Sequence, residues 1–248
     1  MTLRFSETFS DNLSAFPPES TVFALAGTDL RVLDGEHPLV IANRPAIREN
    51  WEREIAANPA LFDGRMVLQH RLNLSETGIA GEAYVVPFSA FMWWRRQPVR
   101  SGAIHLFAYP VLESSDGALV AIRMGAHTAN PGQVYFAAGS LEPEDVVDGR
   151  CDIDSNMARE VMEETGLNLS NAVAGEGLRA IHVHGSVTLF KFFRFDMTAD
   201  EMVTFIAAHM LVAEDKEIAG AVAIRSADPA AQPYNAAMLP VIDWYFNR

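Results

Sequence analysis

The sequence predicts an α/β protein in which a mixed sheet lies between helical layers. Strand-like and helix-like segments are mixed along the chain rather than separated, which is typical of a sheet covered by helices. The chain has 248 residues, of which 49% are hydrophobic, so it can bury a sizeable core. That length exceeds one small domain, and we expect one main domain plus an additional region.

Residues 1–98 are predicted to form an N-terminal α+β region that contributes to a substrate pocket or a dimer. Apolar runs and alternation predict short strands, and Pro45 suits the first turn of a helix. The expected strands are 21–26, 30–33, 38–41, 65–74 and 83–87, and the expected helices are 45–57 and 88–96.

Pro98 and Gly102 punctuate the chain, so we place a domain boundary after residue 98 and a second domain at 99–248. Its strands are expected at 103–112, 118–124, 134–138, 178–184, 187–195 and 218–224, and its helices before Gly166, at 200–211 and at 234–246. This order also indicates a mixed sheet with helices.

Three carboxylates gather on the short helix that precedes Gly166. Glu160, Glu163 and Glu164 are spaced three and four residues apart, so they share one helix face. Like charges this close repel each other unless a cation lies among them, and oxygen ligands of this kind suit Mg²⁺ or Mn²⁺. A solvated acidic face is the alternative interpretation.

Other positions of this helix have local roles. Asp154 or Ser155 is expected to cap its start, and Gly166 fits a left-handed stop. Arg159 and Glu163 are four residues apart and can form an ion pair. The expected buried stripe is Ala158, Val161, Met162 and Thr165.

Residues 159–167 resemble the signature helix of Nudix hydrolases, which reads Arg-Glu-aliphatic-x-Glu-Glu-x-Gly-aliphatic, and all seven specified positions match. Upstream, Gly139 is followed by five residues and then by Asp145, where the family has glutamate. Thirteen residues instead of seven separate Asp145 from the arginine, which indicates an insertion of six residues within the region 146–152. Glu142 or Glu144 could equally approach the site.

The resemblance implies a Nudix-type α/β/α sandwich over roughly residues 100–248 and hydrolysis of a pyrophosphate bond. It implies that Glu160, Glu163 and Glu164 hold Mg²⁺ or Mn²⁺, with the Gly139 carbonyl as a further ligand. Water then attacks phosphorus directly. The general base is a glutamate of the helix or a later one, and the candidates for base or extra ligand are Glu214, Glu217 and Asp145.

Basic residues are candidates for binding the rest of the substrate. Arg123 ends a predicted strand, and His127 follows it in a loop. Arg95 and Arg96 follow Trp93-Trp94, a combination that suits base stacking with phosphate contact. Packing, a dimer surface or simple solvation explains the same residues equally well.

Composition limits the partners. The formal charge of −13 and pI near 4.9 disfavour a protein that tracks a nucleic-acid backbone. No long apolar run predicts a membrane span, the N-terminus lacks an apolar signal core, and the single cysteine, Cys151, excludes an internal disulfide. We therefore expect a cytoplasmic protein, and a homodimer is one possibility.

The sequence leaves the substrate open within one class. We expect a nucleoside diphosphate linked to another moiety, such as a nucleotide sugar or ADP-ribose. The alternative is a catalytically impaired Nudix-fold regulator that binds nucleotides without turnover, which the lengthened loop and Asp145 would favour.

Overall fold

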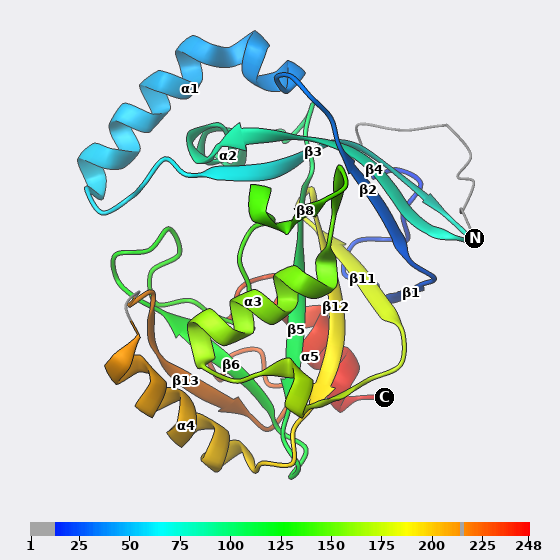
Figure 1. Cartoon of the computed structure of the whole chain (residues 1–248), viewed down its shortest axis with the longest axis vertical. Coiled ribbons are helices and arrows are strands. Elements are labelled where there is room, and N and C mark those ends of the chain that lie inside the picture. Colours follow the sequence, from blue (N-terminus) through cyan, green and yellow to red (C-terminus); the bar gives the residue numbers. More distant parts are fainter. Residues whose placement is uncertain (1–12, 214–215) are drawn as a thin grey trace.

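Two sheets organise the chain in the computed structural model, which describes residues 13–213 and 216–248 (Figure 1). The larger sheet contains β1 (Phe23–Leu25), β5 (His105–Glu113), β6 (Leu119–Met124), β7 (Val134–Tyr135), β10 (Val173–Ala174), β11 (Leu178–Val183), β12 (Ser186–Arg194) and β13 (Ile218–Ile224). The smaller sheet contains β2 (Thr28–Val32), β3 (Arg65–Ser75), β4 (Gly78–Pro87), β8 (Val146–Val147) and β9 (Arg150–Cys151). The helices are α1 (Pro38–Ala57), α2 (Phe88–Arg95), α3 (Ile153–Thr165), α4 (Ala199–Val212) and α5 (Met238–Phe246).

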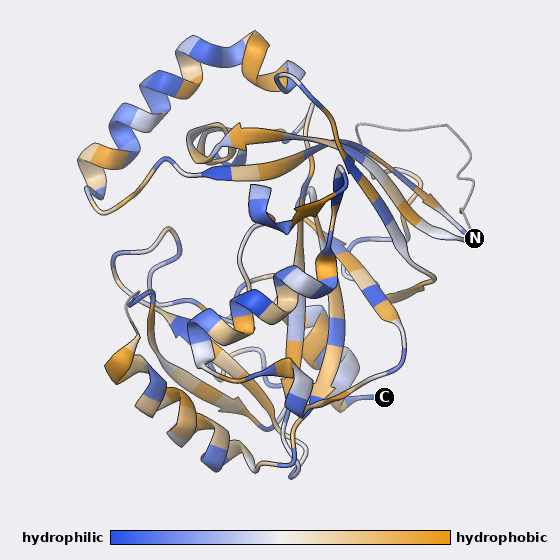
Figure 2. Cartoon of the chain, viewed as in Figure 1, coloured by the Kyte–Doolittle hydropathy of each residue, from blue (hydrophilic) through white to orange (hydrophobic). Residues whose placement is uncertain are grey.

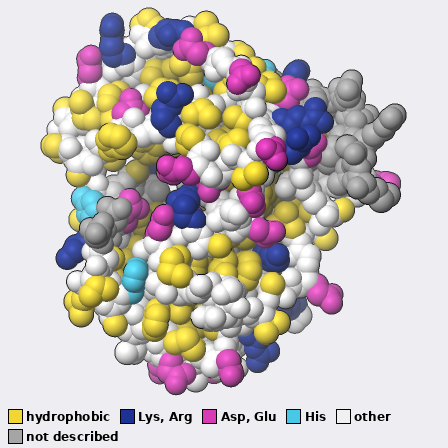
Figure 3. Space-filling view, viewed as in Figure 1, with side chains coloured by type: hydrophobic (Ala, Val, Ile, Leu, Met, Phe, Trp, Pro, Cys, Tyr) yellow, Lys and Arg dark blue, Asp and Glu magenta, His cyan; other side chains and the backbone are white. Residues whose placement is uncertain are grey.

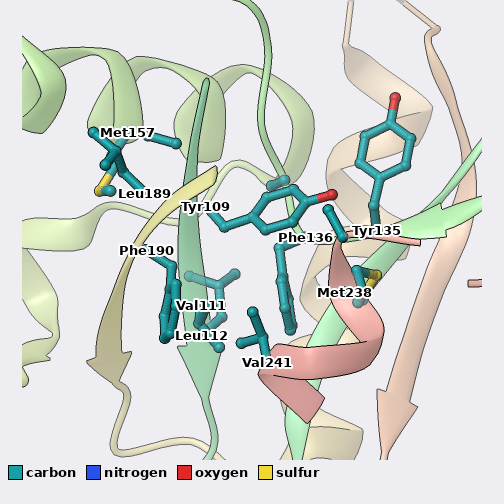
Figure 4. Close-up of a cluster of buried hydrophobic side chains, with 14 of the residues drawn as sticks. Tyr109, Val111, Leu112, Tyr135, Phe136, Met157, Leu189, Phe190, Met238 and Val241 are labelled. Carbon is teal, nitrogen blue, oxygen red and sulfur yellow. The ribbon is translucent and has the colours of Figure 1, made fainter. Parts of the chain in front are cut away.

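The larger sheet is mixed and lies between helices. Its main order is β1-β11-β12-β5-β6-β13, with β12 and β5 parallel and the other main pairs antiparallel. Helix α3 lies in front of β5 and α5 behind it (Figure 1). The close-up in Figure 4 shows Leu112 of β5 in one buried cluster with Met157 of α3 and Val241 of α5. The predicted α/β/α arrangement is therefore confirmed.

The smaller sheet contains strands from both sides of the predicted domain boundary at residue 98. Its order is β3-β4-β2-β9-β8, and β2 runs parallel to β4. The segment predicted as an inserted loop forms the hairpin β8–β9, and Arg150 pairs with Arg31 of β2. In the opposite direction, β1 pairs with β11 of the larger sheet. The division after residue 98 stays a prediction.

The strand predicted at 38–41 is wrong, because α1 begins at Pro38. Proline is favoured in a first helical turn, and the ring of His37 accepts a hydrogen bond from Leu39 N at 3.1 Å. The helix kinks at Asn43, where φ is −127°, two residues before Pro45. The chain therefore has one kinked helix where a strand and a helix were expected.

Other predicted elements are present with shifted ends. Strand β4 starts earlier than predicted, at Gly78, and α5 starts later, at Met238. A turn precedes α5, in which Asn235 accepts from Ala237 N. Hydrophobic residues occur along the strands and on one face of α3, whose other face is hydrophilic (Figure 2). In the part of the chain that the structure describes, no helix is both long and apolar enough to cross a membrane.

Candidate functional site

Helix α3 carries the signature residues and follows directly on the β8–β9 hairpin. Its N-cap is Asp152, whose carboxylate accepts hydrogen bonds from Ser155 N at 3.0 Å and Ser155 Oγ at 2.8 Å. The predicted cap at Asp154 or Ser155 is therefore wrong, because the hairpin ends at Cys151 and the helix starts at once. Gly166 ends the helix with φ of 70°, as predicted.

The buried face of α3 differs in part from the predicted stripe. Val161 and Thr165 are buried as expected, whereas Ala158 and Met162 are exposed. Four residues spaced by four form the buried line, namely Ile153, Met157, Val161 and Thr165. The three glutamates lie off this line and border the cavity described below.

The three glutamates have different surroundings. Glu160 is buried, with 7% of its surface exposed, whereas the Glu163 side chain is 56% exposed. Glu164 Oε2 is buried and has no hydrogen-bond partner in the described residues. Burial raises the pKa of Glu160 to about 8, although Arg159 lowers it. Burial, together with the charges of Glu160 and Glu217, raises the pKa of Glu164 well above its ordinary value.

Arg159 is the cation among these carboxylates. Its guanidinium lies 2.9 Å from Glu163 Oε2, which confirms the predicted ion pair, and 2.8 Å from Glu160 Oε1. Arg159 also donates to both oxygens of Asp145, at 3.3 and 3.0 Å. Asp145 is 3% exposed and further accepts from Asn156 Nδ2. These hydrogen bonds to Asp145 therefore fix the position of the Arg159 guanidinium.

Gly139 lies against the carboxylate of Glu160. A Cβ added to Gly139 would be 2.3 Å from Glu160 Oε1 and 2.6 Å from Oε2. Any side chain at this position would therefore displace the glutamate. The structure thus places Gly139 directly against the helix that carries the signature residues.

A cavity of about 830 Å³ opens beside α3 and brings many predicted residues together. Figure 3 shows acidic and basic side chains gathered around a hollow between the α1–α2 half and the α3–α4 half of the molecule. The predicted residues among its lining are Arg95, His127, Gly139, Arg159, Glu160, Glu163, Glu164 and Glu217. Glu142 and Glu144, the alternatives to Asp145, also line it.

Three predicted residues have other positions. Arg123 lies outside this lining and donates to Gln232 Oε1 at 2.5 Å and to the Gly132 carbonyl at 3.3 Å. Asp145 lies behind Arg159, also outside the lining. Glu214 lies outside the described residues. Of the predicted pairs Trp93-Trp94 and Arg95-Arg96, the second tryptophan and the first arginine line the cavity. Arg96 instead binds Glu54 through two hydrogen bonds, at 2.8 and 3.0 Å.

The donor set suits a hard cation, although it is not assembled around one. Among residues 13–213 and 216–248, no three His, Cys, Asp or Glu side chains are grouped so that they could hold a metal ion. Arg159 takes up oxygens of Glu160 and Glu163 instead. The buried, unpartnered oxygen of Glu164 is nevertheless the kind of atom that a cation satisfies. The residues therefore fit Mg²⁺ or Mn²⁺.

Sequence reasoning missed the aromatic wall of the cavity. The rings of Phe91, His105, Phe107 and Tyr109 line it, and they come from α2 and β5. The alternation of His105, Phe107 and Tyr109 in the predicted strand 103–112 was the available signal, because alternate residues share one face of a strand.

Comparison with known proteins finds similarity in solved structures only. No family model matches the chain, and no curated protein is similar in sequence. The MutT protein of Methanosarcina mazei Go1 aligns over 57% of this chain and 92% of its own, with 16% identity and a TM-score of 0.38. A Nudix hydrolase of Nitrosomonas europaea aligns over 57% and 88%, with 18% identity and a TM-score of 0.36.

A third solved structure, the Nudix domain of Shewanella oneidensis NrtR in complex with ADP ribose, aligns over 56% of this chain and 84% of its own. Its identity is 13% and its TM-score is 0.40. The matched solved structures include Nudix proteins.

Proposed function

We propose that this protein is a Nudix-type pyrophosphohydrolase that uses Mg²⁺ or Mn²⁺ to cleave a nucleoside diphosphate linked to another moiety. The observation that carries the proposal is the arrangement of the signature glutamates. All three line one cavity, Glu160 is buried against Gly139, and Oε2 of Glu164 is buried as well. A surface helix that needs only solubility would leave its carboxylates in solvent.

Glu160 and Glu164 are the residues that would hold the cations, together with Glu163 and the carbonyl of Gly139. Cations bound there would neutralise phosphate oxygens and lower the pKa of a bound water. The chain itself buries Glu160 and one oxygen of Glu164, and charges interact more strongly in such surroundings than in water. Arg159 keeps Glu160 and Glu163 at the cavity through its two ion pairs.

The reaction is a direct attack of water on phosphorus. A bond forms between the water oxygen and one phosphorus, the bridging P–O bond breaks, and the departing phosphate keeps the electron pair. Glu217 is our candidate to accept the proton of the water. It lines the cavity, and its charge is close enough to Glu164 to act on that carboxyl. Glu217 as an extra cation ligand is the alternative role.

A nucleotide-binding regulator without turnover is the second candidate. The observation in its favour is that Arg159 already occupies oxygens of two of the three glutamates. Against it stands the cost of keeping repelling, buried carboxylates together in a protein that needs no cation.

The test is hydrolysis of a panel of nucleoside diphosphate derivatives with Mg²⁺ or Mn²⁺, including nucleotide sugars and ADP-ribose. Wild type is compared with Glu163→Gln and Glu164→Gln, and with Glu52→Gln on the exposed face of α1 as a matched control. We expect turnover in wild type and the control, and a loss of at least about 100-fold in both signature variants. Binding of a panel member without metal-dependent turnover would favour the regulator.

A further inference from the structure

We infer that the end of the cavity at the C-terminus of α2 binds an oxyanion of the substrate that is separate from the cleaved diphosphate; this inference rests on the proposed function. It makes the substrate a nucleoside diphosphate derivative that carries a further phosphate monoester or carboxylate. The residues behind the inference are Arg95 and Arg100, which both line the cavity. We call them the arginine pair.

The two guanidinium groups of the arginine pair lie close together. Arg95 lies 5.6 Å from the ring centroid of Phe91, and Arg100 lies 5.5 Å from that of Trp94. The rings of Phe91 and Trp94 are stacked, with their centroids 6.1 Å apart. Burial lowers the pKa of His105, and the charges of both arginines lower it further, so both act on one ring. Two cations gathered in this way repel each other unless an anion lies with them.

Neutral acceptors hold both guanidinium groups. Arg95 donates to Asn130 Oδ1 at 3.0 Å, and Arg100 donates to the carbonyl of His184 at 2.8 Å. In the part of the chain that the structure describes, neither arginine forms an ion pair with a carboxylate. The hydrogen bonds therefore orient the two groups without neutralising their charge.

The carboxylate whose charge acts on Arg95 is already occupied. This carboxylate is Glu54, and Arg96 binds both of its oxygens, at 2.8 and 3.0 Å. Burial lowers the pKa of Arg95, and the charges of Arg96 and Arg100 lower it further. A partly buried cation beside like charges is costly unless an anion pairs with it. A guanidinium has five N–H donors, so the arginine pair keeps donors for a phosphate or a carboxylate.

The arginine pair is separate from the glutamates that would hold the cations. Phe107 of β5 forms a β-bridge with Ser140, whose neighbour Gly139 lies against Glu160. His105, the ring on which both arginines act, is two residues away from Phe107, about 7 Å along the strand. The cavity thus has carboxylates at one end and guanidinium groups at the other. A diphosphate bound with its cations fits the acidic end, which leaves the basic end for a second anion.

Inorganic phosphate in the absence of metal tests the arginine pair separately from turnover. The full chain is titrated with phosphate at constant ionic strength in the presence of a chelator, and NMR follows the arginine Nε–H signals. The signals of Arg95 and Arg100 are expected to shift together and to saturate, whereas that of Arg96 is expected to stay nearly constant. Without cations, the glutamates repel phosphate from the other end of the cavity.

Substitutions assign the phosphate site. Arg100→Gln is expected to weaken phosphate binding at least tenfold, because it removes a charged donor. Arg100 is exposed, so this variant keeps the core intact, and Arg95→Gln is a second variant with the same expected loss. The matched control is Arg96→Gln, which removes the same charge next to Arg95 but outside the cavity lining, and should change binding less than twofold. Phosphate that leaves the Arg95 and Arg100 signals unshifted, or equal losses in Arg100→Gln and Arg96→Gln, would overturn the inference.

Two matched pairs of substrates locate the oxyanion on the substrate. 2′-Phospho-ADP-ribose differs from ADP-ribose by a phosphate on the nucleoside, and UDP-glucuronate differs from UDP-glucose by a carboxylate on the other moiety. With Mg²⁺ or Mn²⁺, kcat/KM is expected to be at least tenfold higher for the more anionic member of at least one pair. Arg100→Gln is expected to abolish this preference, and Arg96→Gln to keep it.

The two proposals fail in different ways. Phosphate binding at the arginine pair without hydrolysis of any nucleoside diphosphate derivative would contradict the proposed function and leave the oxyanion site standing. Metal-dependent hydrolysis without a preference in either pair of substrates would contradict the inference alone.

Discussion

Gly139 and Glu160 are in such close contact that one methyl group on Gly139 would come within 2.3 Å of the Glu160 carboxylate. They are 21 positions apart in the sequence, and both line the cavity. The close approach requires glycine for reasons of space, because Gly139 is not among the glycines with positive φ.

Gly139→Ala is therefore expected to displace Glu160 and to lower kcat/KM about 100-fold, the usual effect of misplacing a catalytic group by about 1 Å. Steady-state hydrolysis gives the measurement. Gly220→Ala is the matched control, since nothing lies within 4 Å of the added Cβ and its φ is not positive. Equal activity of the two variants would contradict a role for this contact.

Added Mn²⁺ is expected to stabilise the wild-type protein against heat. A cation at about 100 times its dissociation constant adds about 2.7 kcal/mol, and for a chain of this size each kcal/mol raises Tm by about 2–4 °C. Glu164→Gln is expected to abolish this response, because it removes one carboxylate oxygen that the cation would neutralise. Differential scanning calorimetry with and without chelator measures it, and an unchanged response in the variant would argue for another site.

Asp145→Asn is expected to destabilise the protein by about 2–3 kcal/mol, because it weakens a buried pair with Arg159. The expected loss is below the usual range for buried pairs since a quarter of the Arg159 side chain is exposed, at 25%. Urea denaturation gives the free energy of unfolding. Asp154→Asn, whose partner Lys191 lies 3.3 Å away on the surface, is the control and should cost less than about 1 kcal/mol.

Gly166→Ala is expected to cost more than Gly117→Ala, although both residues have positive φ, at 70° and 78°. Each substitution carries left-handed strain of about 1–2 kcal/mol. At Gly166 the new Cβ would also lie 2.6 Å from His209 Nδ1, whereas nothing lies within 4 Å at Gly117. Chemical denaturation of both variants measures the difference. Adding His209→Ala should recover part of the Gly166→Ala loss, and full additivity would show that the two residues do not clash.

The buried His37 is expected to make the protein less stable as the pH falls from about 6.5 to about 4. Burial lowers the pKa of His37 from its model-peptide value of 6.5 to about 4, against the hydrogen bond to Gln69, with His70 adding to the lowering. In this window the unfolded chain binds a proton that the folded chain does not, which costs up to about 3 kcal/mol below the window.

Urea denaturation at pH 7.5, 6 and 5 checks this expectation by comparing wild type with His37→Asn. Asparagine can still cap α1 but does not titrate. As the pH falls, the free energy of unfolding of wild type should decrease more than that of the variant. A difference that stays constant with pH would mean that another group is responsible for the acid sensitivity.

Local sequence was sufficient for the acidic face and the end of helix α3, but not for its N-cap or its whole buried face. Three-four spacing of glutamates and a following glycine depend only on residues within the helix, so the shared face, the Arg159–Glu163 pair and the stop at Gly166 were predictable. The start of α1 was not, because apolar residues at 38–41 suit a strand as well as a helix. Its helical state is decided by the cap at His37, which the burial of that ring under the smaller sheet permits.

The sequence by itself determined the mixed α/β class, the acidic helix and the chemistry that its carboxylates suit. Only the tertiary structure decided that Asp145 faces Arg159, that Glu217 lines the same cavity as Glu164, and that rings of α2 and β5 form one wall. The physical reason is the range of the interactions. Helix periodicity and capping act over a few residues, whereas pairing between strands joins positions that no local pattern relates.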